Sequence, residues 1–83
     1  MEQTVATFYK FAKFPDHAQW KPELTELGKK EKVTGTLILA NEGINGTLSG
    51  PAEGMACFLQ RITSDKRFQD LPIRTMTTPR QTF

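Results

Sequence analysis

A single cysteine, Cys57, is the strongest nucleophile that this chain offers, and His17 is its only histidine. A reactive thiolate needs a pKa lowered by a helix N-terminus or by cationic neighbours, together with a base. Only Arg61, one helical turn further on, lies near Cys57 in the sequence. We therefore expect an incidental surface thiol and no catalytic residue. We also expect no disulfide, no metal site and no cofactor.

Polar side chains gather in residues 33–50, V-T-G-T-L-I-L-A-N-E-G-I-N-G-T-L-S-G. Two β-favouring runs, 34–40 and 44–49, flank Asn41-Glu42-Gly43, which predicts a β-hairpin because Asn and Gly tolerate tight reversals. The consecutive Leu37-Ile38-Leu39 predicts that both faces of the first strand are at least partly covered. In the second strand, one side should meet a core and the other should stay polar. The polar residues either face water beside a turn or form a contact surface: Glu42, Asn45, Thr47 and Ser49.

A second candidate surface combines aromatic and basic residues, namely Tyr9, Phe11, Lys10 and Arg74. RNA recognition on a sheet uses exposed aromatic rings as stacking platforms, with lysine or arginine beside them for phosphates. The paired aromatics of an RRM motif are not present. A core or interdomain role for Tyr9 and Phe11 is the alternative.

These residues depend on the elements that carry them, beginning with a strand over residues 4–12. Apolar residues on both of its faces suit a central strand, with Val5, Tyr9 and Phe11 on one side and Ala6 and Phe8 on the other.

A helix follows over residues 17–30, with Asp16 as a predicted N-cap whose carboxylate accepts an early helical N–H. Because proline lacks an amide hydrogen, Pro22 predicts a loose turn over 16–21 and a regular helix from about Lys21.

After the hairpin, Gly50-Pro51 leads into a second helix, with Pro51 at its first position. Its apolar stripe should lie on the sheet and should leave Cys57 facing outward: Met55, Phe58, Leu59 and Ile62. Residues 71–77 predict a last strand, and Pro72 near its start suits an edge position.

The resulting β-α-β-β-α-β order predicts an α+β, ferredoxin-like sandwich, in which two helices cover one face of a four-stranded antiparallel sheet. Eighty-three residues suit one domain, residues 1–78, followed by a flexible tail over 79–83. No apolar run approaches the roughly 20 residues of a membrane helix, so we expect a soluble, cytoplasmic protein. The net charge of +2 permits an RNA partner without indicating one.

Three stretches carry a resemblance to a known family: V-A-T-F-Y-K-F at residues 5–11, G-T-L-I-L-A-N-E-G-I-N-G-T-L-S-G at 35–50 and S-D-K-R-F-Q-D-L at 64–71. Together they resemble the N-terminal domain of the rhodanese-related tRNA uridine hydroxylases, and E-G-I-N-G-T and R-F-x-D-L are the distinctive parts. The resemblance implies an acylphosphatase-like domain joined to a rhodanese domain that carries the catalytic cysteine. Such proteins are associated with oxygen-dependent hydroxylation of a wobble uridine in tRNA.

Cys57 does not match the rhodanese cysteine, so the catalytic half is expected outside this chain. The resemblance implies a non-catalytic accessory domain that helps position tRNA or its partner, the C-terminal rhodanese domain.

Two alternatives stay open. An acylphosphatase-type hydrolase would need an arginine in a phosphate-cradling loop and an asparagine that orients water. Residues 13–16 after the first strand contain neither glycine nor arginine, although Asn41 and Asn45 could imitate the asparagine. The other alternative is a pure protein-interaction module.

Overall fold

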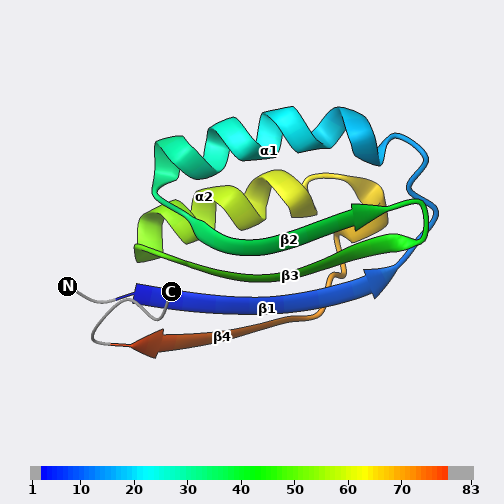
Figure 1. The fold of residues 1–83 in the computed structure, drawn as a ribbon. Helices are drawn as coiled ribbons and strands as arrows, with labels where there is room; N and C mark the ends of the chain where they lie inside the picture. Colours follow the sequence, from blue (N-terminus) through cyan, green and yellow to red (C-terminus); the bar gives the residue numbers. More distant parts are fainter. Residues whose placement is uncertain (1–2, 79–83) are drawn as a thin grey trace.

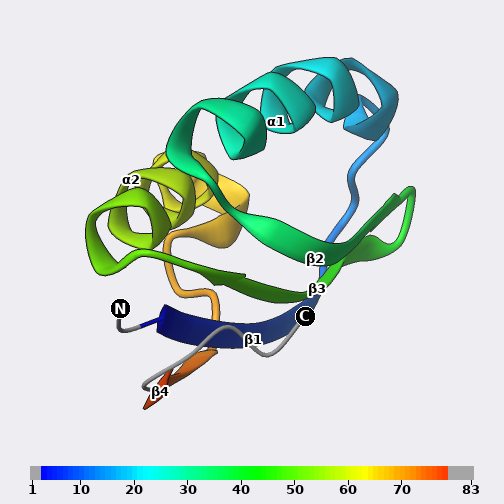
Figure 2. The same cartoon turned by 60° about the vertical axis from the view of Figure 1, so that its left-hand side comes forward.

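The computed structural model describes residues 3–78 and arranges them in two layers, a sheet and two helices that cover one of its faces (Figure 1). Both helices remain on that side of the sheet when the molecule is turned (Figure 2). The elements follow the order β1 (Gln3–Phe11), α1 (His17–Glu31), β2 (Thr34–Ala40), β3 (Gly43–Gly50), α2 (Ala52–Thr63), the 3-10 helix η1 (Lys66–Phe68) and β4 (Ile73–Thr78). The predicted α+β, ferredoxin-like fold is confirmed. The predicted tail, residues 79–83, lies outside the described residues.

The sheet has the strand order β2-β3-β1-β4, and every neighbouring pair is antiparallel. β1 is therefore a central strand and β4 an edge strand, as the sequence predicted. The hairpin between β2 and β3 is also confirmed. Gly43 has a φ of 150°, and a side chain there would overlap the carbonyl oxygen of Lys10 on β1. This position therefore requires glycine.

The core lies between the sheet and the helices. Ala6 and Phe8 are buried on this side of β1, whereas Tyr9 and Phe11 are exposed on the other side, so the predicted alternation is confirmed. The stripe predicted on α2 faces the core as well: Met55, Phe58 and Ile62 are buried, and Leu59 is partly buried against them.

Two details of α1 differ from the sequence prediction. The helix is regular from His17 and contains Pro22 in its interior, instead of beginning near Lys21. Packing of Trp20 stabilises this first turn, because its ring lies edge-on against Phe14 at a centroid distance of 5.0 Å. Asp16 occupies the N-cap position, but its side chain accepts no helical N–H because it binds Arg67 instead.

The ends of the other elements need smaller corrections. Pro51 is the N-cap residue of α2, one position before the helix begins. β4 begins at Ile73 because Pro72 cannot donate to the ladder, and Leu71 is buried ahead of the strand. Cys57 is exposed on α2, as predicted. No helix within residues 3–78 is long and apolar enough to span a membrane.

Candidate functional site

Five of the seven predicted site residues belong to the face of the sheet that no helix of residues 3–78 covers. We call it the open face. The strand register fixes its members, because residues directly opposite each other on paired strands point to the same side. They are Gln3, Val5, Thr7, Tyr9, Phe11, Thr34, Thr36, Ile38, Ala40, Gly43, Asn45, Thr47, Ser49, Arg74 and Met76.

An apolar patch occupies one end of the open face. The side chains of Tyr9, Phe11 and Ile38 are 51%, 70% and 54% exposed. Tyr9 and Phe11 contact each other edge-to-face, with ring centroids 4.9 Å apart. A core role within this domain is thereby excluded for both aromatics, whereas an interdomain role is not. The expectation that Ile38 is partly covered is wrong, because among residues 3–78 no helix packs on this side of β2.

A polar band crosses the sheet beside this patch. Thr36 on β2 lies opposite Thr47 on β3, which lies opposite Thr7 on β1, which lies opposite Arg74 on β4. The band ends in the one basic side chain among the open-face residues. Because threonine hydroxyls both donate and accept hydrogen bonds, the band suits polar contacts with a partner.

The structure brings four of the predicted site residues together on the open face, namely Tyr9, Asn45, Thr47 and Arg74. Ser49 lies on the same side but is fully buried, and within the described chain its hydroxyl has no hydrogen-bond partner. Of the two alternatives for Ser49, the one in which it faces water is therefore excluded. The alternation of side chains along β3 predicts correctly to which side of the sheet Ser49 points. It does not predict that the side chain is buried.

The other two predicted residues lie elsewhere. Lys10 points to the helix side of β1, where its Nζ donates to the carbonyl oxygen of Arg67 at 2.7 Å and pairs with Asp70. Glu42 is exposed in the hairpin loop, and its carbonyl oxygen accepts the amide of Ala12 at 2.8 Å. Lys10 and Tyr9 thus point to opposite sides of the sheet, although they are adjacent in sequence.

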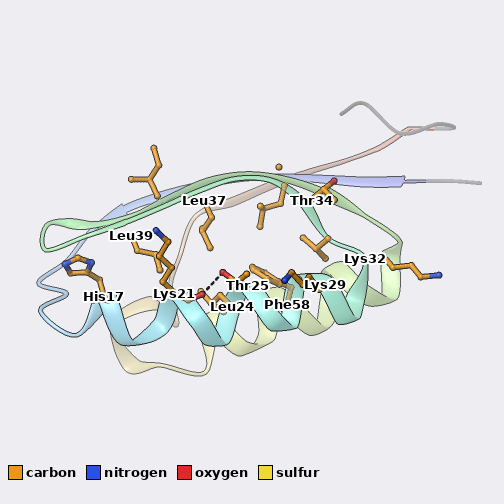
Figure 3. Close-up of a pocket in the computed structure, with 16 residues that line it drawn as sticks. His17, Lys21, Leu24, Thr25, Lys29, Lys32, Thr34, Leu37, Leu39 and Phe58 are labelled. Atoms are coloured by element: carbon orange, nitrogen blue, oxygen red, sulfur yellow. Dashed lines mark hydrogen bonds between the residues drawn. The ribbon is translucent and has the colours of Figure 1, made fainter.

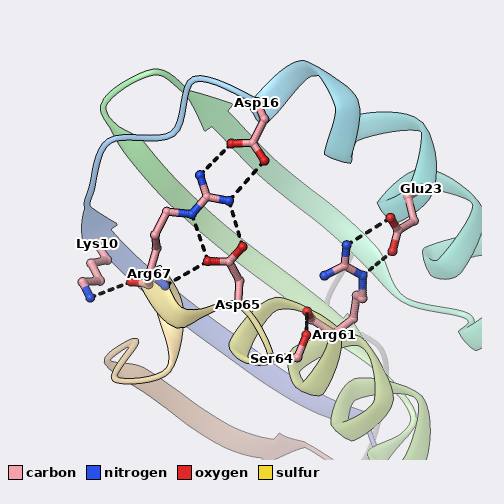
Figure 4. Close-up of polar contacts among 7 residues, drawn as sticks. All are labelled: Lys10, Asp16, Glu23, Arg61, Ser64, Asp65 and Arg67. Atoms are coloured by element: carbon pink, nitrogen blue, oxygen red, sulfur yellow. Dashed lines mark hydrogen bonds and ion pairs between the residues drawn. The ribbon is translucent and has the colours of Figure 1, made fainter.

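Arg67 organises an ion-pair cluster that sequence analysis missed (Figure 4). Its guanidinium lies between two carboxylates, with Nη1 2.6 Å from Oδ1 of Asp16 and Nη2 2.8 Å from Oδ2 of Asp65. Its Cζ also lies 4.8 Å from the ring centroid of Phe14. Hydrogen bonds from Arg67 lower the pKa of Asp65 to about 2 and also lower the pKa of Asp16. The two carboxylates in turn raise the pKa of Arg67.

This cluster gives physical roles to the S-D-K-R-F-Q-D-L segment. Phe68 is fully buried, Leu71 is nearly so, and Asp70 pairs with Lys10. The segment therefore joins the end of β1 and the start of α1 to the turn that follows α2. Asp16 lies 51 positions from Arg67 in the sequence, so the contact that joins these segments could not be predicted from local pattern.

The loop after β1 does not form a phosphate cradle. The amide of Phe14 donates to the carbonyl oxygen of Asn41 at 2.9 Å, so it is not available to an anion. Arg67 is near this loop, but its guanidinium is already bound by two carboxylates. Asn45 lies on the open face, away from the helix that follows the loop. The geometry of residues 3–78 thus gives no support to acylphosphatase chemistry.

Within the described residues, no three His, Cys, Asp or Glu side chains are grouped so that they could hold a metal ion.

Comparison with known proteins gives one family and several relatives. The model of the UPF0176 acylphosphatase-like domain matches residues 3–83. A tRNA uridine(34) hydroxylase of Albidiferax ferrireducens is 44% identical over 70 residues, which cover 84% of this chain and 22% of the relative. The enzyme of the same name from a Picosynechococcus species is 35% identical over 79 residues, covering 95% and 26%. Rhodanese-like domain-containing protein 7 of Arabidopsis thaliana is 42% identical over 78 residues, covering 93% and 16%.

The chain therefore spans about a quarter or less of the length of these relatives. Two solved structures share the fold. A bacterial light-regulated adenylyl cyclase matches with a TM-score of 0.64 at 17% identity, over 100% of this chain and 24% of the cyclase. The de novo designed protein Foldit4 matches with a TM-score of 0.50 at 14% identity, over 98% of this chain and 100% of the design. At these identities the likeness concerns the fold alone.

Proposed function

Because this chain belongs to the family of UPF0176 acylphosphatase-like N-terminal domains, we propose that it is an accessory domain of a tRNA uridine hydroxylase, and that its open face packs against the rhodanese-like remainder of that enzyme. Relatives that match it over most of its length are named for this hydroxylation or for a rhodanese-like domain. In this proposal the domain contributes binding and positioning, while the chemistry takes place elsewhere in the longer protein.

The exposed patch of Tyr9, Phe11 and Ile38 is the observation that carries the proposal. Large apolar side chains that gather on one flat face of a small domain mark a surface that a partner covers. Aromatic residues are also enriched in the buried centres of protein interfaces. The neighbouring threonines would then form the polar part of the same interface.

The open face is less suited to direct contact with tRNA than to contact with a protein. Arg74 is the only basic residue among the open-face residues, and Lys10 points to the other side of the sheet. Affinity for nucleic acid grows with the number of phosphates that lysine and arginine neutralise. A face with one cation therefore favours a protein partner over RNA.

An NMR titration tests the proposal. The labelled chain is mixed with the part of the Albidiferax ferrireducens relative that this chain does not match, produced separately. We expect amide shifts centred on Tyr9, Phe11 and Asn45. The double variant Tyr9→Ser/Phe11→Ser should bind at least about 30-fold more weakly, because buried aromatic anchors dominate such interfaces.

Two controls complete the titration. Gln60→Ser, at an exposed position of α2, should bind as the unchanged chain does. Transfer RNA is added in a parallel series at low and moderate salt. If tRNA shifts the open face and the rhodanese-like part does not, the proposed partner is wrong and the face binds RNA.

An assay of acyl phosphate hydrolysis tests the claim that the domain is non-catalytic. The purified chain should not hydrolyse an acyl phosphate above the uncatalysed rate. Hydrolysis that is lost in Asn41→Ala or Asn45→Ala would contradict the accessory role.

A further inference from the structure

A long groove runs between α1 and β2, mainly on the helix side of the sheet, and reaches the open-face residues Thr34 and Ile38 at the edge (Figure 3). Its volume is about 810 Å³. Leu37 and Leu39 project from β2 toward α1, and Leu24 and Phe58 complete an apolar floor. Leu37 and Leu39 remain only partly buried. The groove therefore offers apolar surface along the length of β2.

Basic side chains line the rim of this groove. Lys21, Lys29 and Lys32 all belong to it, with His17 at one end and Lys32 at the other. Of the described residues that line the groove, none is acidic. Lys29 is 4.0 Å from Glu26, but both side chains are largely exposed, so this pair is weak. The rim is thus complementary to negative charge.

β2 also forms an edge of the sheet that lacks the usual protection. Among residues 3–78, β3 is the only strand that pairs with β2, and alternate residues of an edge strand direct their N–H and C=O groups away from the sheet. Sheet edges are normally blocked by charged residues or proline. β4, the opposite edge, contains Arg74 and follows Pro72, whereas the sequence of β2, TGTLILA, contains neither type of residue.

From these three observations we propose that β2 and the groove bind an extended, acidic segment of a partner polypeptide, which adds to the sheet as a fifth strand. Its backbone pairs with the edge of β2, its apolar side chains on the helix side enter the groove, and its carboxylates meet Lys21, Lys29 and Lys32. The site lies mainly on the helix side and meets the open face only at Thr34 and Ile38 on the edge strand, and it does not depend on the function proposed for that face.

Charge decides between this partner and a second copy of the chain. Pairing of two β2 edges would bring the lysine rim of one copy toward that of the other, which is repulsive. An anionic acyl chain could match the floor and the rim, but it has no backbone amides or carbonyls with which to extend the sheet beyond β2. An extended segment that carries apolar side chains and carboxylates can contact the apolar floor, pair with the lysines of the rim and form backbone hydrogen bonds with β2.

Synthetic peptides as long as β2 test the proposal by NMR titration of the 83-residue chain. The probe has threonine at every second position, and valine and glutamate take turns at the positions between, so that both reach the helix side of the sheet; its control has lysine in place of glutamate. We expect the acidic peptide to shift the amides of β2 and α1 and to slow hydrogen exchange at outward-pointing amides of β2. We expect at least about tenfold weaker binding of the lysine peptide.

Backbone methylation separates strand addition from simple charge attraction. N-methyl groups on alternate residues along one edge of the acidic peptide should abolish binding, while methylation along its other edge should not. On the protein, Lys21→Glu/Lys29→Glu should weaken binding about tenfold. The matched control is Lys30→Glu/Lys66→Glu, because Lys30 is also on α1 but lines a different hollow.

Several outcomes would overturn the proposal. They are equal binding of the acidic and lysine peptides, no effect of methylation on either edge, or shifts confined to β4 and the open face. Concentration-dependent dimerisation through β2 without peptide would identify a second copy as the occupant. Protection of the groove by decanoate, together with no effect of the acidic peptide, would identify an anionic lipid instead.

Discussion

Arg67 connects segments that are far apart in the sequence, because its guanidinium binds Asp16 before α1 and Asp65 after α2. Its side chain is 28% exposed, so these charge-assisted hydrogen bonds are partly shielded from water. A planar guanidinium can donate to two carboxylates at once, which an ammonium group cannot do with the same geometry.

We therefore expect Arg67→Ala to lower the free energy of unfolding by about 2 kcal/mol, because two carboxylates lose their shared donor. Arg67→Lys should recover less than half of that loss. Arg74→Ala, on the open face, is the control and should change stability by less than about 0.5 kcal/mol. Urea denaturation of the three variants measures these values. Equal effects of Arg67→Ala and Arg74→Ala would show that the cluster does not stabilise the fold.

The same cluster makes stability depend on acid. The pKa of Asp65 is about 2 in the folded chain, compared with an ordinary value of 3.8. An aspartate whose pKa is lowered by folding contributes stability that is complete above its unfolded pKa. That contribution decreases as the pH falls from about 4 and is lost below about 2.

Denaturant unfolding at a series of pH values between about 5 and 2 tests this dependence. The unchanged chain should lose stability over that interval, and Asp65→Asn should lose less, because the substituted side chain does not titrate. Parallel curves for the two proteins would mean that Asp65 is not the group responsible.

At the scale of elements, the two helices approach closely where α2 begins. A methyl group on Gly54 would overlap the carbonyl oxygen of Glu31, at the end of α1. Both groups are backbone or directly attached to it, so the overlap can be relieved only by moving one helix. Local sequence pattern could not predict this contact, because it depends on how the helices are placed on the sheet.

Gly54→Ala should therefore destabilise the domain by about 1–3 kcal/mol, although alanine favours helix more than glycine does. Gln60→Ala, at an exposed position of the same helix, should have no such cost. Thermal or urea unfolding measures both. A stabilised Gly54→Ala variant would mean that the helices can separate without loss of packing.

The elements themselves could be predicted from the sequence because each depends on local pattern. Alternation in β1, the apolar stripe on α2 and the Asn-Glu-Gly reversal all gave the right structure. The first turn of α1 was wrong because its stability comes from Trp20 against Phe14 and not from local propensity. For the same reason, the side-chain partners of Asp16 and Lys10 could not be predicted.

For the whole molecule, the two faces of the sheet differ in a way that alternation alone predicted only in part. The register placed Tyr9, Asn45, Thr47 and Arg74 on one surface. The sequence also led us to expect that the open side of β3 stays polar, which holds for Asn45. The sequence could not show that Ile38 and Phe11 are exposed and form an apolar patch on the same surface. Their exposure depends on which parts of the sheet the helices leave uncovered.

The charge distribution of the whole domain leads to a prediction about tRNA. With a net charge of +2 and one arginine on the open face, the isolated chain should bind tRNA weakly, with a Kd above about 10⁻⁴ M at physiological salt. The slope of log K against log salt should be no steeper than about −2, because each cation that meets a phosphate contributes about −0.7 to −0.9.

Fluorescence anisotropy of labelled tRNA between about 50 and 200 mM salt measures this slope. The positive control is Thr7→Lys/Thr36→Lys/Thr47→Lys, which converts the polar band into a basic one on the same backbone. That variant should bind more tightly and steepen the slope by about 2. Tight, steeply salt-dependent binding by the unchanged chain that persists in Lys21→Glu/Lys29→Glu and weakens in Arg74→Ala would mean that tRNA, and not the rhodanese-like part, is the partner of the open face.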